Sequence, residues 1–503
     1  MTKSKMSLLI AFLVVSPLRA QQAAHDTAQT AGPPAYSPQP TDAIDPLGLP
    51  VLPAPGSPDH PLSLDEVVAL SLRYSPALAQ AQPDVAMAAA RIGKAVATGM
   101  PAVSGSLFAG DSRRGAIIPG PDGIAPVSLM SLPPGAFLDE DITAMLPIYT
   151  GGQVDAEKRA AVAARDASLD DVETVRQDAA LQTRIAYRKV LYDRDVLQAR
   201  EQDLAAAEEG LRVDSDRFEA GKLAEVTLFR DRSLVATAQQ NETNARRDYG
   251  LAFAGLEQVM GVSTQSRLVL AEPPAMPETP PAGPATALPA APPPTTTVAV
   301  PPLESPGLLA GDQAEFAGLL AKALAGRPEA HAAAMRIRQA GFDVDRAESG
   351  FRPRVNVMGM QGASRGQNGF NFTIGVVASL PIFEGGALNA ARKESRAEVE
   401  KAMAEERSVR VQIEQDVRSA WLNRAAAREN LVASLTALDQ ARKTYDIQQL
   451  RFATGKGIQL EVLDALAALT NSRTDLARAR FESAVAEDQL LRAAGEILVV
   501  EKP

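Results

Sequence analysis

The side chains that most often carry out chemistry in proteins are scarce or isolated in this sequence. There is no cysteine, which excludes disulfides, thiol catalysis and Cys-based zinc sites. The three histidines, His25, His60 and His331, lack metal-ligand spacing and complete no credible Ser/His/Asp constellation. No phosphate-binding Gly-rich loop appears either. The sequence therefore predicts no catalytic residues, no metal site and no cofactor, and hence a protein that is not an enzyme.

Two carboxylates have a more suggestive spacing. Glu461 and Asp464 are three residues apart, which places them on one face of a helix.

The composition describes the elements that must position these residues. The 503-residue chain has a formal net charge of −10 and is 46% hydrophobic but only 4% aromatic, with alanine filling much of the apolar fraction. Alanine favours helices in close contact. The length predicts two or three core-forming units. An acidic chain without a clustered basic face is not expected to bind nucleic acid.

The N-terminus has the pattern of a secretory signal peptide over residues 1–20. Lys3 and Lys5 precede the apolar run 8–15, and a small residue, Ala20, ends the segment. The run is too short to span a membrane; an N-terminal anchor or a buried helix is the alternative. No later stretch of 18 or more apolar residues follows. We therefore expect an exported protein that would enter a membrane only as a β-barrel.

The rest of the chain is one unit used twice. Proline-rich segments, a tether over 21–61 and a linker over 271–306, flank the repeats 62–270 and 307–496, and a short tail, 497–503, follows. The repeats keep register over long stretches. Pro76 corresponds to Pro328 at an offset of 252 residues, and Arg217-Phe218 corresponds to Arg451-Phe452 at an offset of 234.

Each repeat reads as helix, two strands, helix, turn, helix. The first helix is expected from Leu62 to about Thr98, and the second runs from after Gly152 to Phe218, on the order of 100 Å. A 3.5-residue period predicts left-handed coiled coils, folded into antiparallel hairpins by the Gly221 and Gly455 turns. The heptad positions are Val190, Leu197, Leu204, Leu211 and Phe218, then Leu431, Leu438, Tyr445 and Phe452, and finally Val462, Leu469 and Leu476.

The strands alternate between apolar and small polar residues. The clearest, 370–380, has the length of a membrane-spanning β-strand, and residues 138–148 form a similar apolar face. A half-buried strand in a soluble sheet is the alternative. The strands containing Val103 and Val355 show a weaker pattern. Four strands cannot close a membrane barrel, so closure needs further copies of the chain.

Three kinds of motif, repeated in the same order, carry a family resemblance. They are the Leu-Ser-Leu-Asp-Glu opening at 62–66, the two Leu-Pro-Ile-x-x-Gly-Gly joints and the two Arg-Phe-x-x-Gly turns. With them the chain resembles the TolC-type outer membrane efflux proteins over roughly 62–270 and 307–496. The joint residues are Pro147, Gly151, Gly152, Pro381, Gly385 and Gly386, and the turn residues are Gly221, Lys222, Gly455 and Lys456.

The resemblance implies a mainly α fold with a small β part. It implies a homotrimer whose strands form a twelve-stranded barrel in outer-membrane lipid and whose helices form a tunnel across the periplasm. The hairpins would pinch the tunnel shut. A periplasmic adaptor protein and an inner-membrane transporter would be its partners, with adaptor hairpins docking in grooves between the channel helices.

The same resemblance places a gate near the turns. Glu461 and Asp464 fall where the family has acidic gate residues, and Phe452 falls where it has an aromatic residue, often Tyr. In a threefold assembly Glu461 and Asp464 would form acidic rings, and such rings favour cations; an ordinary solvated helix face is the alternative. Thr227 replaces an Asp of some members, and Gly457 replaces a basic residue, which weakens the case for a salt-bridged gate. Coiled-coil packing is the alternative role of Phe452.

Three functions remain open from the sequence. The first is an exit duct for small molecules in a tripartite efflux pump, and the second, with the same fold, is the exit duct of a type I protein secretion system. The third is a periplasmic coiled-coil scaffold or adaptor without a pore, which would not need two equivalent pairs of alternating strands.

Overall fold

The computed structural model describes residues 43–44, 50–51, 61–112, 135–221, 223–264, 268–271, 310–365, 369–454 and 456–498. The predicted signal peptide and most of the predicted tether, linker and tail lie outside the described residues. So do the turn residues Lys222 and Gly455 and the histidines His25 and His60.

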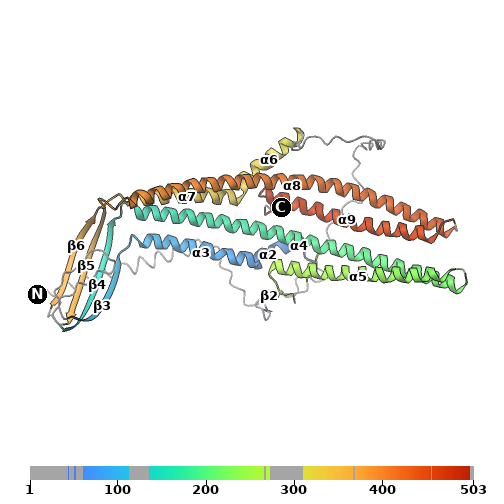
Figure 1. Ribbon diagram of the computed structural model, residues 1–503, viewed down its shortest axis with the longest axis horizontal. Helices are drawn as coiled ribbons and strands as arrows, with labels where there is room; N and C mark the ends of the chain where they lie inside the picture. Colours follow the sequence, from blue (N-terminus) through green and yellow to red (C-terminus); the bar gives the residue numbers. More distant parts are fainter. Residues whose placement is uncertain are drawn as a thin grey trace. The chain divides into compact units, whose positions relative to one another are not determined.

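The described elements appear in the same order twice (Figure 1). A short pair, β1 (Ala43–Ile44) and β2 (Pro50–Val51), precedes them. The first series is α2 (Leu64–Tyr74), α3 (Pro76–Ala97), β3 (Ala102–Ser112), β4 (Gly135–Tyr149), α4 (Gln153–Glu219) and α5 (Glu225–Met260). The second series is α6 (Ala310–Gly326), α7 (Pro328–Ser349), β5 (Arg354–Arg365), β6 (Gly369–Ser379), α8 (Ala387–Ala453) and α9 (Gln459–Ala493). The duplication and the mainly helical fold are confirmed.

The opening helix of each repeat differs from the prediction, because it is two helices instead of one. The first helix begins with a capping box, in which the Ser63 N–H donates to a Glu66 carboxylate oxygen at 2.8 Å. The helix then breaks at Ser75, whose ψ is 123°, and the second repeat breaks at Arg327. Both residues precede a proline, which disfavours the helical conformation of the residue before it. The single helix expected over 62–98 is therefore wrong.

The chain folds as two compact units that each draw on both repeats. Of the described residues, unit 1 contains those within 83–170 and 331–408, and unit 2 contains those within 43–82, 171–330 and 409–498. The sheet belongs to unit 1, whereas both helical turns belong to unit 2.

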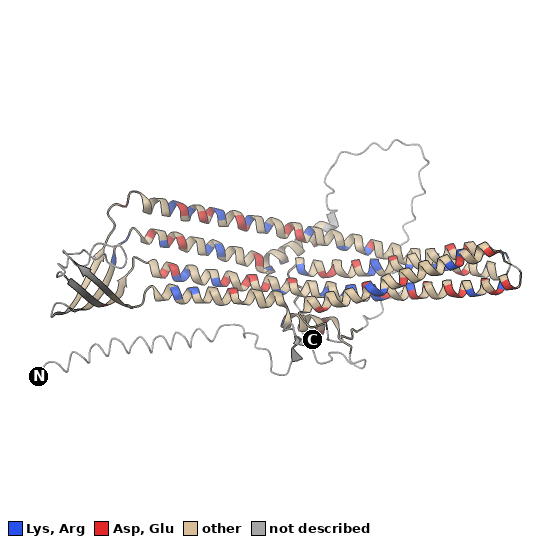
Figure 2. Cartoon of the chain, turned by 60° about the horizontal axis from the view of Figure 1, so that its bottom comes forward, with Lys and Arg blue, Asp and Glu red and all other residues tan. Residues whose placement is uncertain are grey.

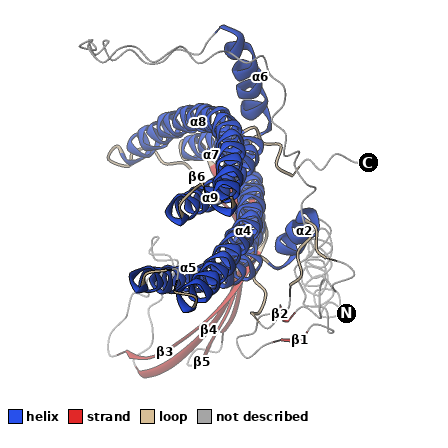
Figure 3. Ribbon diagram, turned by 90° about the vertical axis from the view of Figure 1, so that its right-hand side faces the viewer, coloured by secondary structure: helices blue, strands red, loops and turns tan. Residues whose placement is uncertain are grey.

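The sheet of unit 1 has the antiparallel order β3-β4-β5-β6, and its strands curve together (Figure 3). Directly paired residues share a face, and the register continues one apolar face across all four strands. This face also includes the two strands whose sequence pattern was weak. Its large side chains are exposed in the single chain, apart from the partly exposed Val357; they are Val103, Leu107, Ile142, Leu146, Val357, Phe372, Ile374 and Val376.

The two joints between sheet and helix have the same backbone. Gly151 and Gly152 have φ of 67° and 93°, and Gly385 and Gly386 have φ of 61° and 91°. These are left-handed conformations that side chains rarely adopt, so the glycines are required by geometry. The prolines of the two motifs differ in place, because Pro147 lies inside β4 beside a register shift, whereas Pro381 follows the end of β6.

The two joints allow a matched test of this requirement. Replacing Gly151 with Ala would place a Cβ within 2.9 Å of both the Arg352 Cβ and the Ser349 carbonyl oxygen, whereas a Cβ at Gly385 meets nothing within 4 Å. We expect Gly151→Ala to lower the free energy of unfolding by about 2–4 kcal/mol and Gly385→Ala by only about 1 kcal/mol. Thermal unfolding of both variants followed by circular dichroism measures the difference. Equal losses would show that the contacts of Gly151 do not matter.

Unit 2 has two small apolar cores, one for each repeat. Tyr187, Val190 and Leu256 belong to the first, and Trp421 and Ile413 to the second. The Tyr187 hydroxyl donates to the Ala271 carbonyl at 2.7 Å. Tyr187 and Trp421 occupy equivalent positions of the two repeats, and each is buried in the core of its own repeat.

A buried ion-pair network joins helices of the two repeats in unit 2. The Arg492 guanidinium on α9 donates to Asp178 of α4 at 2.7 Å and to Glu329 of α7 at 2.6 Å. Arg327 donates to Glu329 and also to Asp416 of α8 at 2.9 Å. Burial raises the pKa of Glu329, but the hydrogen bonds from Arg327 and Arg492 outweigh it and lower that pKa overall.

The first repeat lacks this network at the equivalent place. By the repeat offsets, Ser75, Ala77, Gln182 and Gln258 stand where Arg327, Glu329, Asp416 and Arg492 stand in the second repeat. All four of these neutral residues line a cavity of about 960 Å³ between the start of α3, α4 and α5. Four uncharged side chains, three of them smaller than their counterparts, thus line a cavity where the second repeat has ion pairs.

Basic and acidic side chains are interspersed along the helices (Figure 2). No helix in the described part of the chain is long and apolar enough to cross a membrane.

Candidate gate at the hairpin turns

The first hairpin turn connects α4 to α5 through Gly221. Its φ is 72°, and its N–H donates to the Phe218 carbonyl at 2.8 Å, which closes the end of α4. Thr227 lies in the first turn of α5 and is half-buried, with its N–H donating to the Ala224 carbonyl.

The second turn connects α8 to α9. The Lys456 N–H donates to the Arg451 carbonyl at 2.8 Å. Gly457 packs back against α8, because a Cβ there would lie 3.2 Å from both the Arg451 Cβ and the Phe452 nitrogen. This close approach gives a structural reason for a glycine where some family members have a basic residue.

The two acidic residues lie in a helix, as their spacing predicts. Glu461 is in the first turn of α9, where the partial positive charge of the helix N-terminus favours a carboxylate. An Arg451 guanidinium nitrogen lies 3.7 Å from a Glu461 carboxylate oxygen. This distance fits an ion pair but not a hydrogen bond. Asp464, one turn further along, is exposed.

Phe452 is brought to the other hairpin by a residue that the sequence reasoning did not select. The Arg217 guanidinium of α4 lies over the Phe452 ring, 4.7 Å from its centroid. Arg217 also donates to an Asp214 carboxylate oxygen at 3.3 Å. A cation over an aromatic face is attracted by the ring. The two Arg-Phe dipeptides predicted the positions of the turns, but they did not lead to a prediction that Arg217 contacts Phe452.

A buried pair of carboxylates lies beside this contact and was also missed. Asp214 of α4 and Asp231 of α5 are 0% and 4% exposed, and one oxygen of each is buried without a hydrogen-bond partner among the described residues. Burial, a hydrogen bond with Asp214 and the charge of Asp214 raise the pKa of Asp231 to about 6, against a smaller lowering by Arg230. The 17-residue separation across a turn gave no sign that the two would meet.

The predicted gate residues are thus only partly assembled within one chain. Phe452 contacts α4, and Glu461 pairs with Arg451. Among the described residues, Thr227 makes no hydrogen bond or ion pair with Glu461, Asp464 or Phe452. Nor does the described part of the chain place three or more His, Cys, Asp or Glu side chains to hold a metal ion.

Comparison with known proteins identifies the architecture that carries these turns. Residues 67–262 and 319–496 match the family described as "Outer membrane efflux protein", one range in each repeat. The chain belongs to the outer membrane efflux protein family. It is therefore an outer-membrane protein that extends into the periplasm, and its relatives are channels instead of enzymes.

Two curated relatives of this efflux protein carry different printed functions. The chain is 25% identical over 338 residues to the outer membrane efflux protein BepC of Brucella suis biovar 1, covering 66% of each chain. It is 25% identical over 181 residues to the alkaline protease secretion protein AprF of Pseudomonas aeruginosa, covering 34% of this chain and 37% of AprF. The chain thus spans just under two thirds of BepC and about a third of AprF.

A solved channel has the same fold. The CmeC outer membrane channel of Campylobacter jejuni superposes with a TM-score of 0.66 over 86% of each chain, at 17% sequence identity. The match covers most of both chains despite the low identity, so the fold is shared.

Proposed function

We propose that this efflux protein is the exit duct of a tripartite pump, which passively conducts substrates out of the cell. A periplasmic adaptor and an inner-membrane transporter would deliver the substrates. The family match over both repeats is the observation that carries this proposal. The pore-less scaffold considered from the sequence gains no support from the comparisons.

The sheet supports a pore made by several copies. Its apolar face runs across all four strands, and its outer strands, β3 and β6, each lack a partner on one side among the described residues. A sheet edge in lipid leaves backbone groups without hydrogen bonds, at a cost of several kcal/mol each. Three copies joined edge to edge would give a closed twelve-stranded barrel with its apolar face towards lipid.

The helical turns of unit 2 supply the proposed constriction. In a threefold assembly, Glu461 and Asp464 would repeat as two acidic levels one helical turn apart, and Phe452 would hold the second hairpin against the first. Because the Arg451–Glu461 contact is long, the acidic rings remain available to cations.

A type I protein secretion duct is the second candidate. The similarity to a protein named for alkaline protease secretion favours it, although that match covers only a third of this chain. Both candidates share the pore and the gate, and the cargo depends on the transporter.

Single-channel recording in a planar bilayer tests the pore and its gate together. We expect small, cation-preferring openings from the wild-type protein. Replacing both Glu461 and Asp464 with Ala should enlarge the conductance several-fold and weaken the cation preference, because the acidic rings are lost. A pore that the double substitution leaves unchanged would contradict the gate assignment. Well-folded oligomers without any conductance would contradict the channel itself.

A further inference from the structure

The two Arg-Phe dipeptides that precede the hairpin turns form one stacking contact with each other among the described residues. Arg217-Phe218 ends α4 and Arg451-Phe452 ends α8, at equivalent positions of the two repeats. Arg217 stacks on the Phe452 ring. Arg451 and Phe218, the other arginine and phenylalanine, form no such stacking contact among the described residues.

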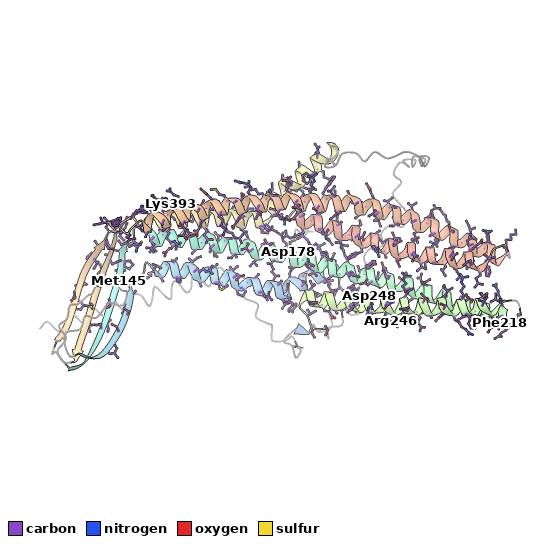
Figure 4. All side chains as sticks on the ribbon, viewed as in Figure 1. Met145, Asp178, Phe218, Arg246, Asp248 and Lys393 are labelled. Carbon is purple, nitrogen blue, oxygen red and sulfur yellow. The ribbon has the colours of Figure 1, made fainter. Side chains whose placement is uncertain are left out.

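The two unused side chains are accessible. Phe218 is 38% exposed and lies at the end of α4 beside the turn (Figure 4). It is the exposed member of its heptad series, whereas its equivalent Phe452 is half-buried beneath Arg217. The Arg451 side chain is 48% exposed; it lies 3.7 Å from Glu461 and donates to the Gln448 side-chain oxygen at 3.2 Å. A guanidinium can stack on an aromatic ring while its N–H groups bond to other residues.

The direction of the existing contact indicates where these side chains find partners. It runs from α4 of the first repeat to α8 of the second. A second contact of the same kind would join α8 of one chain to α4 of another chain. A contact that joins two different surfaces in this head-to-tail way closes into a ring when it is repeated.

We propose that Arg451 stacks on Phe218 of the partner subunit, so that stacks within and between chains alternate around the ring of hairpins. The inference rests on the proposed oligomeric channel and adds the residues that join neighbouring hairpins. Phe218 is thereby covered, and both Arg-Phe dipeptides that precede the hairpin turns are used in the same way.

Other residues on α8 and α5 also suit contact with a second copy of the chain. Inside the chain, Arg188 of α4 pairs with the buried Asp488 of α9. Their equivalents are Leu422 of α8 and Ala254 of α5, which cannot form that ion pair. Leu422 is exposed, as is Leu251 on α5. Where α4 and α9 form an ion pair within the chain, α8 and α5 thus carry apolar residues. Exposed apolar side chains of this kind suit a contact between two chains.

Chemical cross-linking can test this contact directly, because the natural chain contains no cysteine. The variant Phe218→Cys/Arg451→Cys is treated in detergent with a short bifunctional maleimide. We expect covalent dimers and trimers on a denaturing gel. The matched control, Arg217→Cys/Phe452→Cys, should link within one chain and migrate as a monomer. Mixing the two single variants, Phe218→Cys and Arg451→Cys, should give covalent dimers only.

The outcomes separate this inference from the function on which it rests. If light scattering shows trimers but Phe218→Cys/Arg451→Cys gives no covalent dimer while the control links internally, the inter-chain stack is wrong and the channel survives. Efficient dimers from Phe218→Cys alone would also overturn it, since they require like residues to meet. Monomers by light scattering in the wild-type protein would contradict the proposed channel itself.

Discussion

Replacing Arg492 with Met is expected to lower the free energy of unfolding of unit 2 by about 3–5 kcal/mol. Arg492 is buried and is the group that joins Asp178 of the first repeat to Glu329 of the second. Without it, Glu329 keeps only the Arg327 contact and becomes a poorly compensated charge in a low-dielectric site. Thermal and urea unfolding of the purified protein in detergent, followed by circular dichroism, measures the loss.

Two further variants establish that the loss comes from the network. Arg442→Ala removes an exposed arginine from α8 and should change stability by less than about 0.5 kcal/mol. Adding Glu329→Gln to Arg492→Met removes the charge that the first substitution leaves without its partner, and should restore part of the stability. An Arg492→Met protein as stable as the wild type would mean that the network contributes nothing to the fold.

Replacing Asp231 with Asn is expected to stabilise the first hairpin at pH 8 by up to about 3 kcal/mol. The pKa of Asp231 is raised to about 6 in the folded protein, from an ordinary value of 3.8. A raised pKa means that the folded state holds its proton more tightly than the unfolded state. The stability contribution is therefore full below about pH 4 and is lost as the pH rises through about 6. The Asn side chain keeps a hydrogen bond to Asp214 without a charge.

The pH dependence is the distinguishing signature of this pair. The melting temperature of the wild type should fall between pH 5 and pH 8 relative to that of Asp231→Asn, and the two should converge towards pH 4. Asp216→Asn is a suitable control, since Asp216 is an exposed carboxylate on α4, two residues after Asp214, and should leave the pH profile unchanged. A constant difference between wild type and Asp231→Asn at all pH values would exclude proton sharing by the buried carboxylates.

Local periodicity was enough to predict most of the fold. Heptads and alternation predicted the long helices, the four strands and their order in each repeat, since these depend on which face each residue presents. The prediction of a single opening helix was wrong because it used Pro76 only to align the two repeats. The same residue also excludes the helical conformation of Ser75. The continuous apolar face over the weak strands required the register, which only the sheet shows.

The site was less accessible to sequence reasoning. The positions of Glu461, Asp464 and Phe452 came from the family resemblance, and their role in a gate stays a prediction. Arg217 and the Asp214–Asp231 pair were missed because their partners come from other helices, so no local spacing marks them. The absence of a basic residue at 457 weakened the case for a salt bridge and left the question open, and Arg451 supplies a long ion pair to Glu461 from the end of α8.

The central claim is that current passes the hairpin turns through the proposed acidic constriction. Asp464→Cys in this cysteine-free chain places one thiol there, and a negatively charged thiol-reactive sulfonate added during single-channel recording attaches a bulky group to it. The account predicts a stepwise loss of most of the conductance. Glu400→Cys, an exposed position on α8 far from the turn, should show no block under the same treatment. An Asp464→Cys channel that is fully labelled yet conducts unchanged would contradict a constriction at the turns.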